Sequence, residues 1–159
     1  MISVKLFIHE IIHILLSVLA AGFTWRLLPK KRKYFRKRTI LVILGAFLGE
    51  FLLDTDHLFD YMLAYGLHFR FDYFLKGNMF HKLHKIFLPF HAWEWIVVLG
   101  ISIYFTKNIT LRYFLIALTL GISFHLIYDT FYNHMYVLGY SLIYRFIHGF
   151  DTRYLAIPD

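Results

Sequence analysis

The sequence predicts an all-α integral membrane protein, a bundle of four transmembrane helices with further helices lying at the interface. Hydrophobic residues make up 59% of the 159 residues, aromatic residues 21% and charged residues 17%. A soluble domain has about 45–50% apolar and about 25% charged residues. Four spans of about 20 residues with short loops would use most of a chain of this length. We therefore expect a single integral membrane domain over residues 1–159.

The first predicted span covers about residues 6–28 and ends at Pro29, because proline disfavours a helical conformation in the residue before it. Its apolar run is longer than the core of a cleavable signal peptide, which indicates a retained span. The second span is expected at about residues 39–57. The basic block between these spans supplies much of the formal charge of +7. Since apolar helices flank it, we expect the lipid bilayer, and no nucleic acid, as its partner.

Residues 58–88 alternate aromatic residues with charged residues and histidines, which is typical of interfacial helices that keep one face in water. The third span is expected at about residues 90–106 and the fourth at about residues 109–133. The aromatic tail over residues 135–159 predicts another interfacial helix with a frayed end. The chain has no cysteine, which excludes a disulfide framework and a thiolate metal site.

Each predicted span carries histidine or acidic residues, which are costly in hydrocarbon and therefore suggest a functional site. Their positions lie about 20–26 Å from the basic ends of the spans at ~1.5 Å per residue, so we expect one polar layer. Within each span they also recur at helical spacing on one face. The residues at this depth are His13, Asp54, His91, His125 and Asp129, and those that share a helix face with one of them are His9, Glu50 and His57.

The composition of this layer predicts a metal site. Imidazole and carboxylate suit zinc, manganese or iron, and the layer offers enough of them for one or two divalent ions, with zinc as our first expectation. Two ions would activate a water and neutralise charge on a phosphoryl group, which favours a hydrolase of esters or phosphoesters. The expected ligands are His13, Asp54, Asp56, His57, His91, His125 and Asp129.

Asp54 and Glu50 are the expected catalytic carboxylates, because an acidic group near the metal ligands can serve as a base or orient a metal-bound histidine. The aromatic residues around the layer favour an amphiphile, a lipid or lipid-linked molecule, as the substrate. Lysine and arginine concentrate in cytoplasmic loops, so the basic block is expected to be cytoplasmic and the site to face the outer side of the membrane.

Other interpretations of the layer stay open. It could bind or conduct ions without catalysis, because histidine and aspartate rings also serve as ion relays. Residues 9–13 match H-E-x-x-H, in which two histidines bind zinc and the glutamate is the base of a metalloprotease. A protease of the site-2 type would also be expected to carry a Leu-Asp-Gly motif, which does not occur. Haem ligation by paired histidines is a further alternative, but haem gains little from the neighbouring aspartates.

Three sequence motifs resemble those of a known family. Residues 54–57 match an Asp-x-Asp-His motif, residues 122–129 match small-x-x-His-x-x-x-Asp, and residues 13–17 match an early histidine followed by a small residue. These motifs are similar to those of the YdjM-like family of membrane-bound metal-dependent hydrolases. A His-Arg…His-Ser element of that family is matched loosely by His84-Lys85 and His91-Ala92. The resemblance implies a metal-dependent hydrolase of the bacterial inner membrane and adds His84 to the expected ligands.

Overall fold

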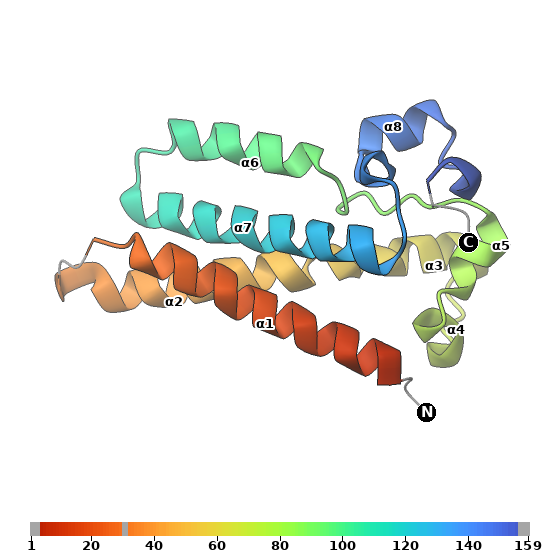
Figure 1. Ribbon diagram of the computed structural model, residues 1–159, viewed down its shortest axis with the longest axis horizontal. Coiled ribbons are helices and arrows are strands. Elements are labelled where there is room, and N and C mark those ends of the chain that lie inside the picture. The colour runs from red at the N-terminus through yellow and green to blue at the C-terminus, as the bar shows by residue number, and fades with distance from the viewer. Residues whose placement is uncertain (1–3, 30–31, 156–159) are drawn as a thin grey trace. The chain divides into compact units, whose positions relative to one another are not determined.

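The computed structural model describes residues 4–29 and 32–155, and every regular element in these residues is a helix (Figure 1). The all-α prediction is therefore confirmed. The chain divides into two compact units, each formed by two separate stretches of sequence. Unit 1 comprises Met1–Leu52 and Trp95–His125, and unit 2 comprises Leu53–Glu94 and Leu126–Asp159.

Unit 1 is built on the helices α1 (Val4–Arg26) and α2 (Arg32–Phe51), which lie side by side (Figure 1). The buried face of α1 consists of His13, Ser17, Ala20 and Thr24, which recur at helical spacing. The hydroxyls of Ser17 and Thr24 donate to carbonyls of their own helix, so neither needs a partner on α2. A stripe of small side chains with satisfied hydroxyls lets a second helix pack closely.

Unit 1 also contains most of α6 (Glu94–Phe105) and the first part of α7 (Ile109–Tyr132). The side chain of Asn108 accepts hydrogen bonds from the backbone N–H groups of Thr110 and Leu111, which caps the start of α7. Buried residues of three helices form the core of the unit. They are Ala20, Leu28, Val42, Ala46 and Ala117.

Glycines set the distance between α2 and α7 within unit 1. A Cβ atom at Gly121 would lie 2.5 Å from the carbonyl oxygen of Ala46, and one at Gly45 would lie 2.6 Å from that of Phe114. Real Cβ atoms do not approach a backbone oxygen so closely, so any larger residue must separate the helices.

Unit 2 is an assembly of short helices, among them η1 (Leu53–Asp56), α3 (His57–Tyr65), α4 (Phe71–Leu75) and α5 (Asn78–Leu83). Its hydrophobic cluster contains Tyr61, Ala64 and Met79. The Tyr61 hydroxyl also ties down the α3–α4 connection, since it accepts from the Arg70 N–H and donates to the His68 carbonyl. The remaining elements are η2 (Val137–Tyr140), α8 (Leu142–Ile147) and η3 (Thr152–Tyr154).

Two helices, α1 and α7, are long and apolar enough to cross a membrane, with 23 and 24 residues. A signal sequence or the core helix of a soluble protein can share these properties. α6 has only 12 residues, and α2 begins with a basic segment. Among the described residues, length and apolar composition therefore support two of the four predicted spans.

The helix predicted to continue through residue 57 ends at Phe51. Asp54 and Asp56 lie in the 3₁₀ turn η1, and His57 begins α3. The prediction that Glu50, Asp54 and His57 share one face of a single helix is therefore wrong. The 3₁₀ turn has a physical basis, because within it the Asp56 carboxylate accepts backbone hydrogen bonds from a distant loop.

The glycine contact in unit 1 can be tested with Gly121→Ala. We expect this variant to lose about 1–3 kcal/mol of unfolding free energy, because the added methyl group collides with backbone that has no room to move. Gly100→Ala is the matched control, since nothing lies within 4 Å of a Cβ atom there. Thermal unfolding in one detergent would measure both, and equal stability of the two variants would contradict the close contact.

Candidate metal centre

The strongest candidate metal centre lies in unit 2 and is organised by Asp56, a buried carboxylate. Its Oδ2 atom accepts hydrogen bonds from the backbone N–H groups of Phe90 (2.7 Å) and His91 (3.1 Å). Its Oδ1 atom lies 2.9 Å from Nδ1 of His91. An ionised carboxylate can only accept, so Nδ1 of His91 carries a proton, and in the neutral imidazole Nε2 keeps its lone pair.

Arg145 holds the same loop from α8. Its guanidinium is fully buried and donates to the carbonyl oxygens of Phe87 (2.7 Å), Leu88 (3.1 Å) and His91 (2.6 Å). Leu88 is held in the left-handed region with φ +35°, a conformation that L-residues rarely adopt. The strained backbone conformation of the loop before His91 is therefore held by the hydrogen bonds of Asp56 and Arg145.

Glu94 in turn fixes the start of α8. Its two carboxylate oxygens accept from the Ser141 hydroxyl and from the backbone N–H groups of Leu142 and Ile143. Negative charge at the first turn of a helix satisfies N–H groups that have no partner within the helix. Asp56, Arg145 and Glu94 therefore form one connected support for His91.

Nε2 of His91 faces two carboxylates at distances that suit metal coordination. It lies 3.6 Å from Oδ1 of Asp54 and 3.7 Å from Oδ2 of Asp129, both too long for hydrogen bonds. Two ligands of one tetrahedral ion with bonds of about 2.1 Å lie about 3.4 Å apart. His57 adds a second imidazole, with its Nδ1 atom 3.9 Å from Oδ1 of Asp54. Asp54, His57 and His91 thus form a group whose ligand atoms all lie within 4.8 Å of one another, close enough to surround one ion.

This group is accessible from outside. The side chain of Asp54 is 36% exposed and that of His57 is 27% exposed, whereas His91 is fully buried. His57 also lines a cavity of about 700 Å³ within unit 2. Catalytic metal sites need such an open position for water and substrate.

Unit 1 contains a buried group of polar side chains of its own. His13, Glu50 and His125 have no exposed surface, and the two imidazole rings stack with centroids 4.2 Å apart. Oε2 of Glu50 lies 2.9 Å from Nδ1 of His13 and 3.5 Å from Nδ1 of His125. Oε1 of Glu50 is buried without a hydrogen-bond partner among the described residues. These three residues could also hold a metal ion.

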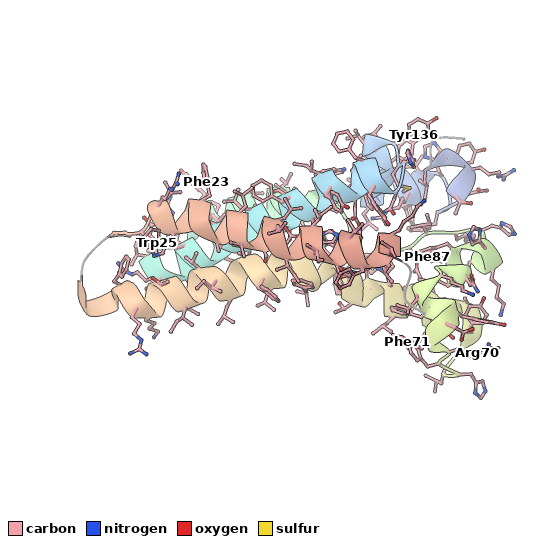
Figure 2. All side chains as sticks on the ribbon, turned by 60° about the horizontal axis from the view of Figure 1, so that its bottom comes forward. Phe23, Trp25, Arg70, Phe71, Phe87 and Tyr136 are labelled. Carbon is pink, nitrogen blue, oxygen red and sulfur yellow. The ribbon has the colours of Figure 1, made fainter. Side chains whose placement is uncertain are left out.

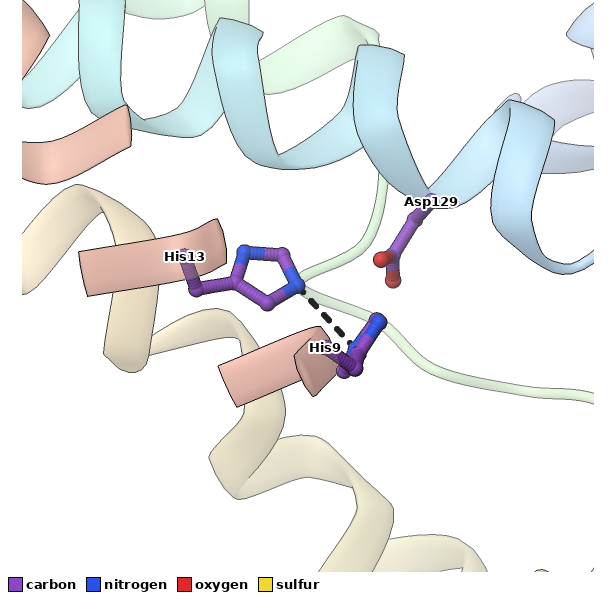
Figure 3. A group of neighbouring side chains, drawn as sticks. All are labelled: His9, His13 and Asp129. Atoms are coloured by element: carbon purple, nitrogen blue, oxygen red, sulfur yellow. Dashed lines mark hydrogen bonds between the residues drawn. The ribbon is translucent and has the colours of Figure 1, made fainter. Parts of the chain in front are cut away.

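His9 extends this group by one helical turn. Its Nε2 atom lies 3.1 Å from Nε2 of His13, and Figure 3 shows the two rings joined by this bond. Asp129, which Figure 3 also labels, belongs to unit 2. The bond of His13 to Glu50 fits the expectation that Glu50 orients a histidine.

The structure distributes the expected ligands over the two units. His84 belongs to neither group, because it ends α5 and lines the cavity of unit 2. A single polar layer across the whole chain stays a prediction. Unit 1 contains His13, Glu50 and His125, and unit 2 contains Asp54, Asp56, His57, His91 and Asp129.

Sequence patterns missed Arg145, whose role comes from three carbonyl contacts more than fifty residues away in sequence. Its only sequence signal is an arginine within an aromatic tail. A buried arginine needs several acceptors, and backbone carbonyls leave no pattern in the sequence.

Comparison with known proteins identifies no relative, since no family model, curated protein or solved structure matches the chain. The resemblance to the YdjM-like family therefore stays a prediction that rests on the motifs alone.

Asp60 provides a pH-dependent test of unit 2. Burial raises the pKa of its carboxyl to about 6, although its Oδ2 atom accepts from the Phe87 N–H. In the unfolded chain the pKa is near 3.8. Between about pH 4 and pH 6 the folded state therefore binds more protons, so stability falls as the pH rises.

We expect the Asp60→Asn variant to show a flatter pH dependence of stability than the parent protein between pH 4 and pH 6. The asparagine can keep the hydrogen bond from Phe87 but cannot ionise. The difference should not exceed about 3 kcal/mol across this range. Unfolding midpoints at several pH values provide the measurement, and identical slopes for the two proteins would contradict the raised pKa.

Proposed function

We propose that the chain is a membrane-embedded, metal-dependent hydrolase of an ester or phosphoester, whose metal centre is the group around His91 in unit 2. The observation that carries the proposal is the arrangement at His91. Asp56 fixes the proton on Nδ1, and Nε2 faces carboxylate oxygens of Asp54 and Asp129 at 3.6 and 3.7 Å. A carboxylate behind a metal-binding histidine is the usual way to fix its tautomer and orientation.

The residues present fit a divalent ion, and zinc is our first candidate because the ligands are imidazole and carboxylate. A bound ion would supply Lewis-acid activation of water and of the ester oxygen. Asp54 is the most exposed carboxylate of the group, so its second oxygen is placed to accept a proton from an attacking water. His57 belongs to this group and also lines the cavity, so it is placed to contact substrate.

Exposed apolar surface supports insertion in a membrane. Only 17% of the apolar window of α1 is buried, although its mean hydropathy is 2.0. The core helix of a soluble protein would be mostly buried. Phe23 and Trp25 are 58% and 45% exposed near the end of this helix (Figure 2). We propose that α1 and α7 cross the bilayer, and the four-span arrangement stays a prediction.

A lipid or lipid-linked substrate would suit a metal centre in a membrane-embedded chain, because an amphiphile can reach such a centre along the membrane surface. An assignment to the bacterial inner membrane rests on the resemblance to the YdjM-like family.

A second candidate function is metal or ion binding without catalysis. It is favoured by the closed group in unit 1, because a substrate cannot reach His13, Glu50 or His125, which have no exposed surface. The H-E-x-x-H protease interpretation would need Glu10 as the base. Substitution of Glu10 by Gln tests it, because a hydrolase centred on His91 should keep its activity while a protease should lose it.

Metal content and turnover test the proposal together. Protein purified without chelator should contain about one or two equivalents of a divalent metal and should hydrolyse a soluble phosphoester such as p-nitrophenyl phosphate. His91→Ala should lose at least about half of the metal and nearly all of the activity, because the fixed Nε2 donor is gone. Elemental analysis and release of nitrophenol provide the measurements.

His68→Ala is the matched control, since this exposed histidine lies outside the group around His91. It should keep both metal and activity. Metal retained without turnover of any ester would favour the non-catalytic candidate, and purified protein without metal would overturn the metal centre.

Membrane orientation can be tested with single cysteines, because the chain has none. We expect a cysteine at the exposed position Lys37 to be cytoplasmic and protected from an impermeant thiol reagent on intact cells. A cysteine at the exposed position His68 should be labelled. The reverse pattern would place the metal centre on the cytoplasmic side.

A further inference from the structure

The cavity of about 700 Å³ in unit 2 has a one-sided charge. The cations Lys76 and Arg153 and the histidines His57, His81 and His84 all contribute to its wall. Among the described residues that line it, none is acidic. A concave surface with only positive or hydrogen-bond-donating charge concentrates anions.

Two of these groups have exposed side chains that a ligand can reach. Lys76 makes no ion pair with a described residue, although its charge interacts with that of Asp72. The His84 side chain is also exposed, and an imidazole keeps at least one N–H donor in either protonation state. The Arg153 guanidinium already pairs with Asp151 at 2.6 Å, so it contributes less net charge.

The walls that carry these groups are held together by backbone hydrogen bonds. The Thr152 N–H donates to the His84 carbonyl, and the Ile86 N–H donates to the Phe150 carbonyl. A bridge between Lys85 and Asp151 lies between them. The backbone of the wall that carries His84 is therefore fixed against residues 150–152 before any ligand binds.

Much of the remaining cavity wall is apolar, and the cavity reaches His57 at the metal centre. Phe80, Ile86, Leu88 and Met135 line it, and the Phe80 ring contacts the His57 imidazole edge to face with centroids 5.7 Å apart. A ligand seated here would place an anionic group against Lys76 and His84 and an apolar portion beside His57.

We propose that this cavity is the substrate-binding site and that it recognises a phosphate group through Lys76 and His84. That the bound ligand is a substrate rests on the proposed function. That the cavity binds phosphate does not, because the cavity and its positive charge are present without a metal. A phosphomonoester carries about −1.5 to −2 charges at pH 7 and three acceptor oxygens, which match a lysine ammonium and imidazole N–H groups. A sulfate ester or a carboxylate carries less negative charge than a phosphomonoester.

The test measures binding of inorganic phosphate to the full chain in detergent after treatment with a chelator, so that no metal contributes. The variant Lys76→Ala/His84→Gly removes both donors, and glycine suits the left-handed backbone of His84 at φ +52°. We expect its phosphate affinity to fall about tenfold or more, because hydrogen bonds to charged groups are lost. Lys76→Arg should keep binding within about threefold, because it keeps the charge.

Lys107→Ala/His68→Ala is the matched control. It removes one exposed lysine and one exposed histidine that do not line the cavity. Its phosphate affinity should equal that of the parent protein. Equal weakening in both double variants, or none in Lys76→Ala/His84→Gly, would overturn the proposal. Should that variant unfold, the single charge reversal Lys76→Glu provides the same comparison at an exposed position.

Two further arms separate the possible outcomes. His91→Ala should bind phosphate as the parent does even if it loses its metal, so failure of the metal centre leaves this inference intact. Glycerol phosphate in solution and phosphatidic acid in nanodiscs of zwitterionic lipid distinguish a soluble ester from a lipid headgroup. If phosphate binding required bound metal and did not change on substitution of Lys76, the proposed phosphate site in the cavity would be wrong. The proposed hydrolase function would be unaffected.

Discussion

The carboxylate of Asp56 is the constraint on which unit 2 depends. One buried side chain accepts three hydrogen bonds from the segment around His91, two from backbone N–H groups and one from the imidazole. A buried carboxylate without such donors would be severely destabilising. Folding of this loop and the orientation of the histidine are therefore a single event, and the lone pair of Nε2 is directed before any metal arrives.

Arg145 supplies the opposing half of this support. Its buried guanidinium requires acceptors, and the carbonyls of Phe87, Leu88 and His91 provide them in a loop that has no regular structure of its own. Asp56 accepts hydrogen bonds from N–H groups of the loop, and Arg145 donates to its carbonyls. The backbone polar groups of a buried loop are satisfied by side chains where no helix or sheet satisfies them.

Much of the fold class and the identity of the polar residues could be predicted from the sequence. Apolar runs located α1 and α7, and the costly placement of His13, His91, His125 and Asp129 singled them out as functional candidates. The end of α2 could not be predicted, because the 3₁₀ turn at Asp54 and Asp56 depends on a loop thirty-odd residues later. The role of Arg145 could not be predicted either, because long-range hydrogen bonds to backbone carbonyls produce no periodic pattern in the sequence.

The two groups of polar residues differ in what they can do. His13, Glu50 and His125 are closed to solvent and suit a structural or ion-binding role, whereas Asp54 is partly exposed and His57 lines an open cavity. Anomalous diffraction at the zinc absorption edge, in crystals of zinc-loaded protein, tests most directly whether His91 is a metal ligand. We predict an ion about 2.0–2.2 Å from Nε2 of His91 and from carboxylate oxygens of Asp54 and Asp129. An ion bound only at His13, or no ion at either group, would contradict the account.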